Sequence, residues 1–165
     1  MAKGSGGTRS GNALNPRGVG SRSVGGGLSA EDRDFYANDH GAMASDWYQN
    51  RRNAKGKAIE RLAKEWHRED MRNAATPTAS SLKKEYANGE QAIYSSSVGN
   101  HTNLNLTRDY DGTYYASVET AGFGVVQLHS GRWKTTLNEA KSRSIQAFDE
   151  YRKQKTHGST MRFDY

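Results

Sequence analysis

The stretch from His101 to Gln154 constrains the fold most, because its side-chain periods and its turn residues are both clear. Alternation of apolar and polar residues indicates β-strands, whereas a period of 3.6 residues indicates a helix. Asp-Gly, Ala-Gly and Ser-Gly dipeptides separate the successive apolar segments of this stretch, and such dipeptides mark turns. The pattern therefore predicts an antiparallel meander closed by one amphipathic helix.

The first hairpin of the meander can be placed in register. A two-residue turn at Asp111-Gly112 would pair Leu106 with Ser117 and would mix the two faces of the sheet. A three-residue loop over 110–112 pairs Leu106 with Ala116 instead, so that apolar residues share one face. It also places Gly112 at the left-handed position that such a loop requires. We therefore predict the three-residue loop.

A capping signal begins the helix that follows the meander. Thr136 and Glu139 form the pattern Thr-x-x-Glu, in which the threonine hydroxyl accepts a hydrogen bond from a free backbone N–H. The helix is expected from Leu137 to about Gln154. Its inward stripe is expected to consist of Leu137, Ala140, Ser144, Ile145, Phe148 and Tyr151.

Flanking segments complete the expected sheet region. The segment 91–97 predicts a first strand, and 81–88 predicts a short helix that Gly89 ends. Near the C-terminus, Met161, Phe163 and Tyr165 alternate with polar residues, so this tail would add an edge strand or dock on a partner.

The pattern from Ser29 to about Met71 is helical. It fits either one long bent helix or two helices that meet near Gly56. The fold class is therefore α+β, with an N-terminal long helix or helical pair followed by a three- to four-stranded antiparallel meander packed on a C-terminal helix. The expected regions are a disordered Gly/Ser/Arg-rich tail (1–28), a helical region (29–88), sheet plus helix (89–155) and a C-terminal tail (156–165).

Composition limits the class of protein. Only 33% of the residues are hydrophobic, so the core must be small. The 24 Lys and Arg exceed the 18 Asp and Glu by 6, which favours an anionic partner, although simple solubility also explains such a surplus. The chain has no cysteine, no secretory signal and no apolar run of membrane-spanning length. We expect a cytoplasmic protein without membrane association.

Five cations gather on one side of the helical region. At 100° per residue they fall within about 80° of one another, opposite the apolar side, and such a row is typical of a surface that contacts phosphates. The alternative is an ordinary solvated face, in which Glu60, Glu65 and Glu69 pair with these cations. The five are Lys57, Arg61, Lys64, Arg68 and Arg72, and the N-terminal tail adds Arg9, Arg17 and Arg22.

Catalytic and metal-binding patterns are nearly absent from the sequence. None of the five histidines has a metal-like spacing to another, so no metal and no cofactor are expected. His101, His129 and Lys134 would supply the acid, base and cation of a weak ribonuclease. The alternative is that both histidines are surface residues at turns, and we expect a protein that is not an enzyme.

Two resemblances follow from these residues. The leader MAKGSGGTRSG resembles leaders of phage and mobile-element proteins, which implies such an origin and, in that case, the cytoplasm of the host cell. The sheet followed by a helix resembles, in topology, the DNA-binding domains of plant AP2 factors and of phage integrase arms, which read DNA with the exposed sheet face. The corresponding face here carries Asn103, Asn105, Thr107, Tyr115, Ser117 and Glu119. It has hardly any positive charge, so the phosphate contacts are assigned to the helix and the tail.

Three functional hypotheses result. The first is a small basic phage or mobile-element protein that binds DNA or RNA without catalysis. The second is an interaction module that inhibits a host or defence factor, and the third is the ribonuclease. Association of copies through the helical region is a further expectation. The aromatic anchors of the second hypothesis, which are expected to be exposed, are Tyr36, Trp47, Tyr48, Phe163 and Tyr165.

Overall fold

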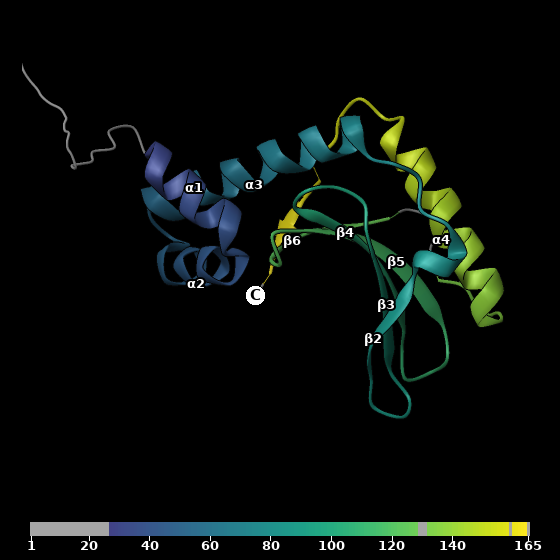
Figure 1. Ribbon diagram of the computed structural model, residues 1–165. Helices are drawn as coiled ribbons and strands as arrows, with labels where there is room; N and C mark the ends of the chain where they lie inside the picture. The colour runs from purple at the N-terminus through teal and green to yellow at the C-terminus, as the bar shows by residue number, and fades with distance from the viewer. Residues whose placement is uncertain (1–26, 129–131, 159, 165) are drawn as a thin grey trace, which may run out of the picture. The chain divides into compact units, whose positions relative to one another are not determined.

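The structure is a computed structural model that describes residues 27–128, 132–158 and 160–164. The chain divides into two compact units that meet between Leu62 and Ala63, and each is described by itself. Helix α3 (Ala54–Asn73) contributes to both (Figure 1).

Within the described residues 27–62, the first unit holds three helical segments where one or two helices were expected. Helix α1 (Ala30–Asn38) ends at Asp39, whose backbone is not helical. The Asp39 carboxylate accepts the N–H of Ala42 at 3.0 Å at the start of α2 (His40–Asn50). A second break precedes α3, where the Asn53 side chain accepts the N–H of Gly56 at 3.1 Å. Two short polar side chains thus begin new helices, as capping residues do.

Gly56 lies inside α3 and does not mark a break. A Cβ atom at this position would lie 1.9 Å from the carbonyl oxygen of Asn50, so glycine allows α3 to pass close to the end of α2. Burial of apolar side chains around this approach forms the core of the first unit. The buried residues are Tyr36, Met43, Ala44, Trp47, Ala58, Ile59 and Leu62.

The second unit contains an antiparallel sheet of six strands, more than the three or four expected. Helix α4 (Leu137–Arg152) lies along one face of this sheet and packs against its central strands (Figure 1). The strands follow one another in sequence order across the sheet. They are β2 (Lys83–Ala87), β3 (Ala92–Ser97), β4 (Thr102–Arg108), β5 (Tyr114–Thr120), β6 (Gly124–Gln127) and β7 (Arg162–Phe163).

Strand β2 replaces the short helix expected over 81–88. A single 3-10 turn, Ala79–Ser81, precedes it, and Leu82, between the turn and the strand, is buried. The helical interpretation was wrong because it weighed local propensity alone, whereas pairing with β3 satisfies the backbone groups of this segment.

The hairpin register is confirmed. Leu106 pairs with Ala116 and Leu104 pairs with Val118 across β4 and β5, and Gly112 has a φ of 82°. On β6, Val126 is buried and pairs with Val118. These apolar residues all face α4, which gives the sheet its buried side.

Helix α4 begins as the capping pattern predicts. The hydroxyl of Thr136 accepts the N–H of Glu139 at 3.2 Å, while the Glu139 carboxylate pairs with Arg143. Leu137 and Ile145 are only partly buried. The fully buried stripe consists of Ala140, Ser144, Ala147, Phe148 and Tyr151.

The C-terminal segment forms the last strand of the sheet. Arg162 and Phe163 pair with β6, and Asp164 donates its N–H to the carbonyl oxygen of Phe123 at 2.7 Å. The predicted edge strand is confirmed, with Met161 buried beside it. Among the described residues, no helix has the length and apolar character needed to cross a bilayer.

Candidate functional site

The five cations of α3 lie on the exposed side of the helix. Lys57, Arg61, Arg68 and Arg72 are exposed and Lys64 is half-buried, whereas Leu62 and other residues of the opposite side are buried. Fifteen residue steps at a rise of 1.5 Å make this cation row about 22 Å long. The row is therefore accessible along a single helix.

Acidic residues neutralise part of the cation row. The Lys57 ammonium lies 3.8 Å from Glu60, whose other carboxylate oxygen accepts the indole N–H of Trp47 at 2.8 Å. Arg68 and Arg72 form no ion pair with the residues that the structure describes. The C-terminal part of the row therefore retains its full positive charge.

A buried carboxylate anchors the second half of α3. Asp70 accepts the backbone N–H of Asn100 at 3.1 Å, the N–H of His101 at 3.0 Å and the hydroxyl of Thr102 at 2.6 Å. Gly99 permits this approach, because a Cβ there would lie 2.5 Å from the carboxyl carbon. The turn between β3 and β4 thus wraps around Asp70 and fixes the orientation of the helix.

A chain of buried hydrogen bonds continues from this anchor. The hydroxyls of Thr102 and Thr120 lie 3.0 Å apart, and Thr120 is 3.0 Å from Nδ1 of His67. The Nε2 atom of His67 lies 2.9 Å from the hydroxyl of Tyr151, which accepts the N–H of Gly158 at 3.3 Å. The chain therefore joins α3 to β4, β5, α4 and the C-terminal segment.

The two ends of the chain fix the direction of every hydrogen bond in it. An ionised carboxylate only accepts, so Thr102 donates to Asp70, Thr120 donates to Thr102, and Nδ1–H of His67 donates to Thr120. The unprotonated Nε2 atom of His67 then accepts a hydrogen bond from the Tyr151 hydroxyl. Desolvation by burial, with a smaller effect of His157, lowers the pKa of His67 to about 4. The neutral imidazole that the chain requires is thus the favoured form.

The sequence pattern did not reveal this chain. His67 is 53 residues from Thr120 and 84 residues from Tyr151, and no local spacing connects residues so far apart. The one available signal was a histidine on the buried side of a predicted helix. The hydrogen-bond chain anchors the second half of α3, which carries Lys64, Arg68 and Arg72.

The structure separates the proposed ribonuclease residues. His101 precedes the first residue of β4, and its ring stacks on Trp66 at 3.9 Å. Lys134 follows Trp133, which pairs with Tyr114 at the opposite end of the β4–β5 ladder. Six strand residues at 3.3 Å each place about 20 Å between the two ends. His129 lies outside the described residues, as do Arg9, Arg17 and Arg22.

Two of the aromatic residues expected on the surface are core residues. Tyr36 is 1% exposed and donates to Asp46, and Trp47 is 5% exposed. These expectations were wrong because each side chain satisfies its polar atom inside the first unit. Phe163 is half-buried beside Phe123, whereas Tyr48 is exposed under the guanidinium of Arg51. Tyr165 lies outside the described residues.

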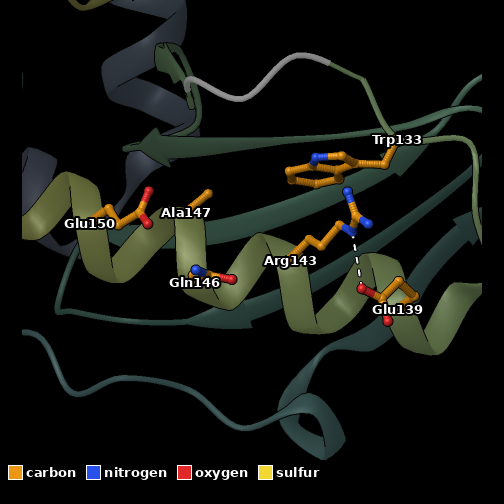
Figure 2. A pocket seen from close by; sticks show the side chains of 6 residues that line it. All are labelled: Trp133, Glu139, Arg143, Gln146, Ala147 and Glu150. Atoms are coloured by element: carbon orange, nitrogen blue, oxygen red, sulfur yellow. Dashed lines mark hydrogen bonds and ion pairs between the residues drawn. The ribbon is translucent and has the colours of Figure 1, made fainter.

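A pocket of about 320 Å³ lies between Trp133 and the outer side of α4 (Figure 2). An ion pair between Glu139 and Arg143, 3.0 Å long, occupies one end of it. No residue of the three functional hypotheses lines the pocket. Its lining consists of Trp133, Glu139, Arg143, Gln146, Ala147 and Glu150. In the described part of the chain, no cluster of three or more His, Asp or Glu residues could hold a metal ion.

Comparison of the chain with protein families, with curated proteins and with solved structures finds no match.

Proposed function

We propose that this protein binds nucleic acid without catalysis, through the cation row of α3. The observation that carries the proposal is the row itself, in which five Lys and Arg residues share one accessible sector of a single helix. The two C-terminal members, Arg68 and Arg72, have no acidic partner among the described residues. A polyanion that aligns with this helix would release counterions at each contact.

The residue types of the cation row favour binding that is independent of nucleotide sequence. Successive members are separated by three or four residues, or about 4.5 to 6 Å along the helix. The sector contains no Asn or Gln, the amide side chains that read adenine by paired hydrogen bonds. We therefore assign the row to phosphate contacts on DNA or RNA, and we assign the same role to Arg9, Arg17 and Arg22.

Charge reversal tests the proposal. In the variant Arg61→Glu, Arg68→Glu and Arg72→Glu, we expect weaker binding to a mixed-sequence duplex. The slope of log affinity against log salt concentration should decrease in magnitude by roughly three. A matched control reverses three exposed lysines elsewhere, Lys84, Lys134 and Lys155, and therefore changes the net charge by the same amount.

Fluorescence anisotropy over a series of salt concentrations provides the measurement. The proposal predicts a large loss in the helix variant and a small loss in the control. Equal affinity of the helix variant and the wild type would contradict it, and equal losses in both variants would show that only net charge matters. Circular dichroism checks that both variants are folded.

A further inference from the structure

The face of the sheet opposite α4 presents an ordered polar surface. No helix of the second unit covers this face among the residues that the structure describes (Figure 1). The strand register places one residue of each of five strands in a single row across its middle. With strands about 4.8 Å apart the row is about 19 Å long. It consists of Lys83, Ser95, Asn105, Ser117 and Gln127.

A second row on the same face carries aromatic side chains. Tyr86 pairs with Ile93, Ile93 with Thr107, and Thr107 with Tyr115. Tyr86 is 49% exposed, and the guanidinium of Arg132 lies 4.8 Å from the centre of the Tyr115 ring. The two tyrosines are three strands apart, or about 14 Å.

An irregularity of β2 determines which side chain occupies this row. Lys84 pairs with Tyr94 and Tyr86 pairs with Ile93, so the register shifts at Glu85. A regular strand would place Glu85 opposite Ile93. A bulge redirects side chains in this way, and here it presents an aromatic ring where a carboxylate would otherwise stand.

Two exposed cations lie at the margins of this face. Lys83 and Arg162 are exposed at its opposite edges, whereas Arg132, which stands beside Tyr115, is ion-paired with Asp109 at 3.0 Å. Glu119 is the one carboxylate in the paired open-face positions of β3 to β6. It accepts a hydrogen bond from the amide of Asn105 at 3.5 Å. Cations at the margins thus surround a centre of amide and hydroxyl groups.

We propose that the open face of the sheet binds single-stranded nucleic acid, with bases stacked on Tyr86 and Tyr115. The amides of Asn105 and Gln127 contact base edges, and Lys83 and Arg162 contact phosphates. Stacking needs unpaired bases, because the rings of a duplex base pair are already stacked on their neighbours. This proposal rests on the proposed function and specifies the form of the nucleic acid.

Paired substitutions of the two tyrosines test this inference. The variant Tyr86→Leu and Tyr115→Leu removes both rings, whereas Tyr86→Phe and Tyr115→Phe retains them. The probe is labelled oligo(dT) or oligo(U) of roughly 12 nucleotides, a length within the range that one stacking domain binds. We expect the leucine variant to bind at least tenfold more weakly and the phenylalanine variant to bind like the wild type.

A duplex of the same length separates the two proposals. The inference predicts that the leucine variant retains wild-type affinity for the duplex, which the cation row of α3 binds. Equal affinity of the leucine variant and the wild type for the single strand would overturn the sheet site and leave the proposed function intact. Loss of duplex binding only after charge reversal of α3, together with loss of single-strand binding in the leucine variant, would support both. Absence of NMR amide shifts on the open face when oligo(dT) or oligo(U) is added would also overturn the sheet site.

Discussion

At the residue scale, the buried hydrogen-bond chain has a defined polarity. Its donors and acceptors match only when His67 is neutral and carries its proton on Nδ1. A second proton on Nε2 would turn the acceptor of the Tyr151 hydroxyl into a donor. The Tyr151 hydroxyl would then have to accept hydrogen bonds from both Nε2–H and the N–H of Gly158. Its own proton would no longer have Nε2 as an acceptor. Burial adds the cost of desolvating the imidazolium.

This polarity predicts how stability changes with pH. Because the pKa of His67 in the folded protein, about 4, lies below its unfolded value of 6.5, its contribution is complete above about pH 6.5 and is lost as the pH falls toward 4. The shift corresponds to about 3 kcal/mol. We expect His67→Gln to be less stable than the wild type at pH 7. Between pH 7 and pH 4, its free energy of unfolding should fall by about 3 kcal/mol less than that of the wild type. Urea unfolding at the two pH values measures this difference. Parallel losses in the two proteins would refute the assignment.

At the element scale, close packing outweighs helix propensity in α3. Alanine is favoured over glycine by about 1 kcal/mol inside an exposed helix. A Cβ at Gly56, however, would lie 1.9 Å from the carbonyl oxygen of Asn50. The backbone cannot yield as a flexible side chain can, so the overlap separates α2 from α3.

Two glycine substitutions compare these opposing effects. We expect Gly56→Ala to lower the free energy of unfolding by about 2 to 4 kcal/mol, since overpacking of this kind displaces the backbone. Gly41→Ala in α2, where the added Cβ would lie 3.4 Å from its nearest neighbour, should be neutral or slightly stabilising. Thermal unfolding of both variants gives the comparison. A Gly56→Ala protein as stable as the wild type would show that α2 and α3 do not pack closely.

At the scale of the whole molecule, the last strand completes the sheet around a small core. The sheet begins with the exposed β2 and ends with β7, which is formed by the C-terminal residues. Met161 is buried next to it, and Phe163 packs beside Phe123. Removal of this segment would expose apolar area and leave β6 as an open edge, which promotes aggregation.

Truncation after Gly158 tests this role. We expect the shortened chain to unfold at a lower urea concentration. Its free energy of unfolding should fall by about 2 to 4 kcal/mol, because the apolar surfaces that Met161 and Phe163 cover become exposed to water. Light scattering should also detect aggregates at concentrations where the full chain stays dispersed. The substitution Arg162→Ser is a control, because it keeps the strand and removes only an exposed side chain. Unchanged stability of the truncated chain would contradict the role of β7.

Local sequence was sufficient for elements that depend on neighbouring residues. The three-residue loop followed from alternation and from Gly112, and the start of α4 followed from Thr136. It was insufficient where distant pairing decides the conformation. Residues 81–88 have helical propensity, yet β3 supplies hydrogen-bond partners that make β2 a strand.

The sequence by itself determined the central hairpin and its register, the capped helix and the cation row, because each depends on side-chain period and short-range hydrogen bonds. The tertiary structure alone decided that Tyr36 and Trp47 are core residues and that His101 and Lys134 lie at opposite ends of a ladder. It also brought together the buried hydrogen-bond chain that runs from Asp70 through His67 to Gly158. These outcomes require contacts between residues far apart in the chain, and burial determines which of them form because unpaired polar groups are costly away from water.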